Sequence, residues 1–498
     1  MAKRDLAGFA DSKELKQFSL QPGAFRLGNI HPDHGLKQEA AIRDDRHLFI
    51  VAGSRAGKGT TMIIPNLIDW PGGVVCIDPK GENASVTAMR RARPEDQAGS
   101  GTKVRHFLGQ DVAILDPFHT VRGPARKFRV AYDPIADIDK GKPQESDQIL
   151  TIAESIVIGE GDKNQHFSDG AETLLAGLIE AVVHAKDTKP KTLARCRMEF
   201  QAGAKSMKAF LAKAPETPAR LSKDAHALLE DAGEDEGGGF LTTLSRQLRW
   251  MADPRMQRHL QDGGFSLAKA VKGKSSVYIC VPPSRIPRMN RWLRLIVRIA
   301  LDAKMDTSLE HEGAQTLFIL DEFYALGSLK LIEEAAAYMA GYGIKLLPVI
   351  QNIGQVKKLY EKNWETFLSN AGGIIAFGLN DLETEKYISD RMGPVMSWES
   401  SYSESRSRHP DNLEASNISR SESLAMRERA IRWPSEVHKD GARDKMRAFV
   451  ITADGPPFMV ERVSYLERKG EGVFEDQDDI RSWEAGLPEK VRKQLDDM

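Results

Sequence analysis

Short apolar runs recur along the chain, and most of them are bounded by Gly, Pro or Asp. They are residues Leu48–Ala52, Gly73–Ile77, Val112–Leu115, Ser276–Val281, Leu317–Leu320, Lys345–Ile350, Gly373–Phe377 and Ala448–Thr452. Segments with apolar residues at helical spacing separate most of these runs. Buried strands that alternate with helices form mostly parallel sheets with helices on both faces. The pattern therefore predicts an α/β fold with a mostly parallel sheet flanked by helices.

One long interval breaks this alternation. Residues 144–264 contain no convincing strand and are rich in Ala, Leu, Lys and Glu at helical spacing. We expect an inserted all-α domain here, between two strands of the sheet. The sheet domain is then discontinuous in sequence, with a first part at 47–143 and a second part at 265–396.

The remaining segments have distinct compositions. Residues 1–46 form an N-terminal segment leading into the sheet domain, and residues 429–466 complete that domain. Between the last strands, residues 397–428 are rich in Ser and charged residues and poor in aliphatic ones, which predicts a mobile loop. Residues 467–498 form a charged C-terminal tail.

Composition excludes several classes of protein. A chain of 498 residues is too long for one compact core. With a net charge of −1, any nucleic-acid contact must come from a local patch or from a ring of subunits. The three cysteines lie far apart without CxxC spacing, so neither a zinc site nor a disulfide framework is expected. No signal peptide or sufficiently long apolar segment is visible, which predicts a cytoplasmic protein without a membrane span.

The strongest chemical signal follows the first apolar run. The strand Leu48–Val51 leads into a glycine-bearing loop that ends in Lys58, and a helix is expected to follow. In this order, backbone N–H groups and a helix N-terminus cradle phosphates, and the lysine reaches the terminal phosphates. The predicted nucleotide-binding residues are Gly53, Ser54, Arg55, Ala56, Gly57, Lys58, Gly59, Thr60 and Thr61.

This loop departs from the usual G-x-x-x-x-G-K-[ST] pattern. The first position is Ala52, or its glycine has shifted to Gly53, and Gly59 follows Lys58 in place of Ser or Thr. The hydroxyl that binds magnesium should stand next to the lysine. Thr60 is therefore the first candidate for a magnesium ligand, and Thr61 is the second.

Two further strands end in polar residues suited to nucleotide hydrolysis. Residues Thr316–Leu320 precede Asp321 and Glu322, which would hold magnesium through water and polarise the hydrolytic water, respectively. The strand before Gln351 ends in an amide, at a position where RecA-type motors place a group that touches the γ-phosphate. An accidental Asp-Glu pair at a sheet edge, or a glutamine that caps a turn, are the alternatives. The site so predicted uses ATP and Mg²⁺, with Lys58, Glu322 and Gln351 as catalytic residues.

Taken together, these motifs resemble the type IV secretion coupling proteins of the TraG type, the conjugative DNA-transfer ATPases. The matching segments are 52–60, 64–67, 78–82, 320–323 and 341–351, with lesser matches at 115–118 and 453–457. The likeness runs from about Gly8 to Tyr465, and the family often has Gly-Lys-Gly in the phosphate loop.

The resemblance implies a RecA-like motor domain with an inserted all-α domain. It also implies a homo-hexameric ring, or a monomer when DNA or an anchor is missing. The implied activity is a DNA-stimulated P-loop ATPase that passes single-stranded DNA bound to a relaxase, or effector proteins, to a secretion channel. The implied partners are the relaxosome and the inner-membrane components of the secretion system, and the implied location is cytoplasmic or peripheral at the cytoplasmic face of the inner membrane.

The sequence departs from the family pattern in two ways. Family members typically begin with a transmembrane hairpin, whereas here the soluble region begins almost at Met1. We expect either a natural member without a membrane anchor or one that borrows its anchor from a partner. Some relatives have an arginine just before the sensor strand, but the segment 337–345 has none, leaving Arg391 or Arg55 as substitutes. Two other functions therefore stay open: a cargo receptor or adaptor with weak or silent ATPase activity, and a soluble RecA-like duplex-DNA motor.

Basic segments are candidate DNA contacts, although charge runs are usually solvated faces. They are 122–129, the arginines of 285–294 around Trp292, and Arg406, Arg408 and Arg420 near Trp398 and Tyr402.

Overall fold

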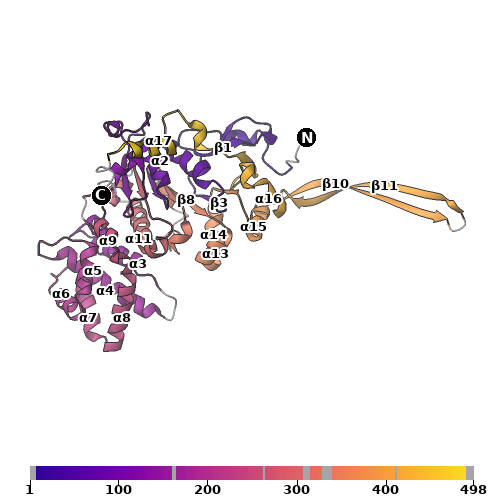
Figure 1. Ribbon diagram of the computed structural model, residues 1–498. Helices are drawn as coiled ribbons and strands as arrows, with labels where there is room; N and C mark the ends of the chain where they lie inside the picture. Colours follow the sequence, from indigo (N-terminus) through magenta and orange to yellow (C-terminus); the bar gives the residue numbers. More distant parts are fainter. Residues whose placement is uncertain are drawn as a thin grey trace.

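A large sheet forms the centre of the computed structural model (Figure 1). The structure describes residues 7–159, 164–261, 264–306, 315–327, 332, 339–409 and 412–488. The sheet has eleven strands in the order β2-β1-β13-β12-β9-β3-β8-β7-β4-β6-β5. They are β1 (Phe25–Ile30), β2 (Glu39–Ile42), β3 (Leu48–Ala52), β4 (Val74–Ile77), β5 (Asp111–Leu115), β6 (Ser275–Ile279), β7 (Thr316–Leu320), β8 (Ile344–Ile350), β9 (Gly373–Phe377), β12 (Arg447–Thr452) and β13 (Phe458–Glu461).

Parallel pairing dominates the half of the sheet from β9 to β5. From β12 outward, the pairs with β9, β13, β1 and β2 are antiparallel. The prediction of a mostly parallel sheet is confirmed, and each predicted apolar run overlaps one of its strands, although the run Ser276–Val281 extends past the end of β6. The prediction missed β1, β2 and β13, which extend the sheet at its antiparallel edge.

Helices cover both faces of this sheet, so alternate residues along a strand are buried in two different cores. In β3, Phe49 and Val51 belong to one core, whereas Leu48 and Ile50 belong to the other. Strands buried on both faces read as continuous apolar runs, which is why the sequence pattern located them. Among the described residues, the α-helices outside the insertion are α1 (Ile64–Asp69), α2 (Glu82–Arg91), α11 (Ile286–Met305), α13 (Ile353–Tyr360), α14 (Trp364–Ser369), α15 (Leu382–Met392), α16 (Pro434–Asp440) and α17 (Gln477–Gly486).

The described residues between β5 and β6 form helices joined by turns and irregular segments, and none of them lies in a strand of the sheet. Its α-helices are α3 (Glu145–Ile156), α4 (Gln165–His184), α5 (Leu193–Gln201), α6 (Ala204–Ala212), α7 (Leu221–Asp231), α8 (Glu234–Gln247), α9 (Pro254–His259) and α10 (Leu267–Lys272). Figure 1 shows α4 to α8 grouped beside the sheet, at the lower left. Buried residues of this group join the core on one face of the sheet. The division into a separate all-α domain at 144–264 stays a prediction.

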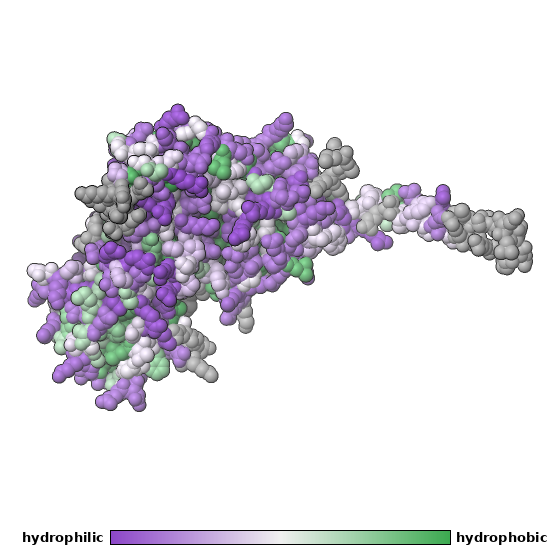
Figure 2. Space-filling model, in the orientation of Figure 1, coloured by the Kyte–Doolittle hydropathy of each residue, from purple (hydrophilic) through white to green (hydrophobic). Residues whose placement is uncertain are grey.

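The Ser-rich segment corrects one expectation. The described residues of 397–428 do not form a loop, because they lie in two long antiparallel strands, β10 (Pro394–His409) and β11 (Asn412–Ala430). This ribbon projects from the body of the protein (Figures 1 and 2). The strands satisfy each other's backbone groups, and Ser401 and Ser423 add a cross-strand hydrogen bond of 2.8 Å. A ribbon that is not buried needs few aliphatic residues, so its composition resembles that of a loop.

In the described part of the chain, no helix has the length and hydrophobicity that a membrane span requires. Cys76, Cys196 and Cys280 are buried free thiols.

Candidate nucleotide-binding site

A cavity of about 460 Å³ lies at the carboxyl ends of the central parallel strands. This edge is the usual ligand site of open α/β sheets. Residues from the loops after β3, β4, β6, β7 and β8 line it, joined by one arginine from the segment before β12. The lining residues are Ser54, Arg55, Ala56, Gly57, Lys58, Gly59, Thr60, Asp78, Pro79, Lys80, Glu82, Asn83, Pro283, Asp321, Glu322, Gln351 and Arg443.

The predicted phosphate loop lines this cavity, except at its two ends. Gly53 and Thr61 do not line it. The Gly53 N–H donates to the carbonyl of Gly378 at 3.2 Å, and a Cβ on Gly53 would lie 2.2 Å from that oxygen. Glycine at position 53 is therefore needed for close packing against the loop after β9.

The structure distinguishes the two candidate hydroxyls. Thr60 and Thr61 both donate to the carbonyl of Gly57, at 3.1 and 2.9 Å. Thr61 is buried, and its oxygen accepts a hydrogen bond of 3.2 Å from Nη1 of Arg462. Thr60 lines the cavity and keeps its oxygen lone pairs available, so it is the better candidate for a metal ligand.

The predicted acids and the sensor amide meet in the same cavity. Burial raises the pKa of Asp321, and the nearby Lys58 partly opposes this shift. Glu322 has a left-handed backbone with φ of +65°, which is uncommon outside glycine. The side-chain amide of Gln351 donates to Oε1 of Glu322 at 3.4 Å. Such strained, electrostatically perturbed groups in a cleft are typical of functional sites.

Several lining residues were missed as site candidates. Burial raises the pKa of Asp78 to about 7, and one of its oxygens accepts the Ala84 N–H at 2.8 Å. Lys80 adds a cation beside these acids. Because β4 is parallel to β7, residues after both strands share one edge, and this signal was available in the sequence. Arg443 offered no such signal, since it comes from a short turn far along the chain.

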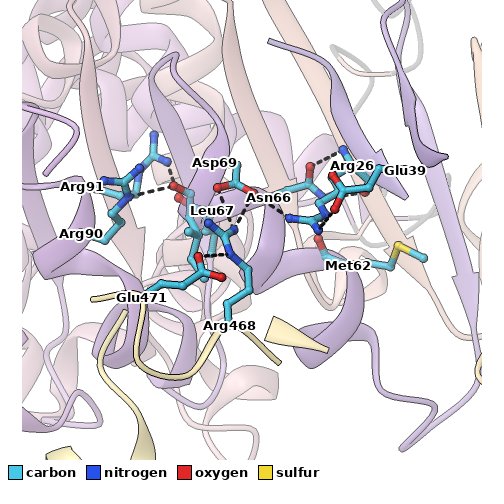
Figure 3. Close-up of polar contacts among 11 residues, drawn as sticks. Arg26, Glu39, Met62, Asn66, Leu67, Asp69, Arg90, Arg91, Arg468 and Glu471 are labelled. Carbon is cyan, nitrogen blue, oxygen red and sulfur yellow. Dashed lines mark hydrogen bonds and ion pairs between the residues drawn. The ribbon is translucent and has the colours of Figure 1, made fainter. Parts of the chain in front are cut away.

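A polar network holds α1, the helix after the phosphate loop (Figure 3). Asn66 is buried and bridges to β1: it accepts from the Arg26 N–H at 2.7 Å and donates to the Arg26 carbonyl at 2.9 Å. At the end of α1, Asp69 pairs with both Arg26 and Arg468, at 3.3 and 2.8 Å. The 64–67 motif thus anchors the phosphate loop's helix, and the segment after β13 reinforces it.

Several proposed basic contacts serve the fold instead. Trp292 is fully buried, which excludes it as an accessible stacking surface for bases in this conformation. Arg129 pairs with the buried Asp116 at 3.1 Å, and Arg126 with Glu484 at 3.2 Å. Of the two substitute arginines, Arg55 lines the cavity and Arg391 does not.

Comparison with known proteins gives the family. Residues 11–494 match the family model described as type IV secretory system conjugative DNA transfer. The chain belongs to this family. The family assignment confirms the resemblance seen in the motifs.

Curated relatives include Protein VirD4 of Rhizobium radiobacter, 27% identical over 91% of this chain and 61% of the relative. The conjugal transfer protein TraG of Escherichia coli is 28% identical over 70% of this chain and 55% of the relative. The chain thus spans less than two thirds of the length of these curated relatives.

Solved structures share the fold of this family member. The plasmid coupling protein TrwB in complex with ADP and Mg²⁺ is 14% identical, with a TM-score of 0.64 over 92% of this chain and 94% of that chain. TrwB in its sulphate complex is 15% identical, with a TM-score of 0.65 over 92% and 93% of the two chains. At this identity the likeness shows the fold alone, and it confirms the predicted RecA-like class.

Proposed function

We propose that this chain is an ATP-hydrolysing coupling protein that passes single-stranded DNA bound to a relaxase, or an effector protein, to a type IV secretion channel. The observation that carries the proposal is the meeting of Lys58, Asp321 and Glu322 in one cavity of a chain that belongs to the conjugative DNA transfer family. A pure scaffold has no physical need for this trio. TrwB, which shares the fold, has been solved with ADP and Mg²⁺.

The residues present fit magnesium and a nucleoside triphosphate. The cavity offers a half-buried carboxylate at Asp321 and a hydroxyl at Thr60 for the metal, and a backbone cradle for phosphates. When bound, Mg²⁺ would neutralise charge that develops on the phosphate oxygens. These residues offer the hard oxygen ligands that Mg²⁺ prefers.

The chain's own side chains then have separate roles. The Lys58 ammonium binds the β- and γ-phosphates through charge-assisted hydrogen bonds. The Glu322 carboxylate holds the attacking water and takes its proton, while Gln351 orients that carboxylate through its amide. Arg55 lines the cavity and supplies a further cation.

The assembly belongs to the same proposal. We infer a hexameric ring that works with the relaxosome and with inner-membrane components of the secretion system, at the cytoplasmic face of that membrane. Oriented cations of repeated subunits would give a nearly neutral chain a local field for DNA.

ATP hydrolysis by the purified chain, measured with and without single-stranded and duplex DNA, tests the proposal. Single-strand stimulation that disappears in Lys58→Ala supports the coupling motor. Hydrolysis stimulated only by duplex DNA favours a duplex-DNA motor. No hydrolysis with any DNA favours a cargo receptor, and co-precipitation with a relaxase would then be the informative measurement.

A further inference from the structure

The sheet order gives the cavity two ends. Asp78 follows β4 and Asp321 follows β7, on one side of the phosphate loop. Arg443 precedes β12, which lies on the other side of the phosphate-loop strand, beyond β9. If the γ-phosphate faces the acids, the α-phosphate and the nucleoside extend toward Arg443.

Arg443 is well placed to meet an anion. It lies on a single 3₁₀ turn, Arg443–Lys445, which ends at Met446 with a left-handed φ of +51°. Its side chain lines the cavity and is exposed. Among the described residues, its guanidinium has no hydrogen-bond or ion-pair partner. Its donors are thus available to a phosphate, which a planar guanidinium can bind through two hydrogen bonds.

A second arginine ties this turn to the phosphate loop. Arg462 follows β13 and is only 3% exposed. Its Nη1 donates to the Ala56 carbonyl at 2.9 Å and to the Thr61 hydroxyl at 3.2 Å. Arg462 also contacts the end of the Arg443 turn. Its backbone N–H donates to the Met446 carbonyl at 2.7 Å, and its Nε donates to the Arg447 carbonyl at 3.2 Å.

The setting of Arg462 is unusual for a structural arginine. Its guanidinium lies 4.1 Å from the centroid of the Phe377 ring, and burial lowers its pKa to about 10. Its partners in the described residues are backbone carbonyls and a hydroxyl, and its Nη2 has none. A buried cation without a carboxylate is costly, and here its hydrogen bonds hold together the two segments that would contact the nucleotide.

We propose that Arg443 binds the α-phosphate of a nucleoside di- or triphosphate from within the same chain, and that Arg462 is the positioning residue that fixes the Arg443 turn against the phosphate loop. This inference rests on the proposed function and deepens it. In this proposal, residues beside the antiparallel strands β12 and β13 complete the nucleotide site on the side of the α-phosphate.

Binding of fluorescent ADP and ATP with Mg²⁺, together with steady-state hydrolysis, tests Arg443. Arg443→Ala should weaken both nucleotides about tenfold, because both carry the α-phosphate, and should raise KM equally while kcat changes less than about twofold. The matched control is Lys445→Ala, on the same turn but absent from the cavity lining, which should behave as wild type. Unchanged affinity in Arg443→Ala overturns the inference, as does a collapse of kcat with ADP binding intact, which would place Arg443 at the γ-phosphate.

Arg462→Lys tests the positioning role, since lysine keeps the charge and loses the forked geometry. The Arg462→Lys variant should bind ADP more weakly, while the melting temperature of the nucleotide-free protein changes little. The double variant with Arg443→Ala should bind ADP only slightly more weakly than Arg443→Ala alone. Fully additive effects would contradict the coupling of the two arginines. If wild type binds neither nucleotide, the proposed function fails as well; if wild type binds and Arg443→Ala binds equally, only this inference fails.

Discussion

The nucleotide cavity and the β10–β11 ribbon contrast in how their residues are stabilised. In the cavity, Asp78 is buried and Asp321 is half-buried, both acids have raised pKa values, and Glu322 has a strained backbone. On the ribbon, Trp398 and Tyr402 are 66% and 63% exposed. The strands pair with each other over nearly their whole length.

The two regions therefore differ in how they affect folding stability. Buried like charges and left-handed backbone reduce folding stability, and they persist where a ligand that binds only the folded state can offset them. An exposed two-stranded ribbon contributes little to the stability of the body. Changes in the cavity should therefore alter chemistry strongly, whereas changes in the ribbon should leave both folding and nucleotide binding intact.

Removal of the phosphate-loop lysine should have the largest effect. Lys58→Ala removes the cation that the proposed function assigns to the terminal phosphates. We expect about 100-fold weaker ATP binding, measured by fluorescent-nucleotide titration. Lys445→Ala is the control for loss of a lysine near the cavity. Equal affinity in Lys58→Ala and wild type would remove the loop from the site.

Substitution of the sensor amide should affect turnover more than binding. Gln351→Ala removes the hydrogen bond to Glu322 and leaves the phosphate loop intact. We expect kcat to fall about tenfold with KM nearly unchanged. A rise in KM alone would show that Gln351 only binds substrate.

The buried acid after β4 predicts a pH dependence of stability. The folded pKa of Asp78, about 7, lies above its ordinary value of 3.8, so the folded state binds more protons between these values. Stability of the metal-free protein should thus fall as pH rises from about 4 through 7. Asp78→Asn keeps an oxygen acceptor for Ala84 and should raise the melting temperature by a few degrees at pH 8 but not at pH 4. The same gain at both pH values would contradict this origin.

Shortening of the ribbon should have the smallest effect. Replacing residues 397–427 by a short Gly-Ser turn removes exposed strand and leaves the roots of both strands. We expect the melting temperature to change by less than about 2 °C and nucleotide affinity to stay as in wild type. A large drop in either quantity would show that the ribbon supports the cavity, and the contrast between the two regions would fail.

The sequence located the groups that follow the buried strands β3, β7 and β8. Asp321 and Gln351 come directly after apolar runs, and Lys58 ends the glycine-bearing loop that follows the first run. It did not locate Arg443 and Arg462. Strand pairing at the antiparallel edge brings Arg443 to the cavity and Arg462 against the phosphate loop, and their local sequence carries no phosphate-binding signal. The ribbon was mistaken for a loop because exposed strands keep the polar composition of loops. The strand pairs of β10 and β11 cannot be deduced from that composition.

Single-turnover hydrolysis of Mg²⁺-ATP by wild type and Glu322→Gln tests most directly whether the cavity hydrolyses ATP with Glu322 as the base. The substitution keeps the shape of the side chain and removes the carboxylate that takes the water's proton. If Glu322 takes the proton of the attacking water, wild type releases phosphate, while the variant binds ATP with similar affinity and releases phosphate at least about 100-fold more slowly. Equal rates in the two proteins, or ATP binding without any hydrolysis in wild type, would contradict it.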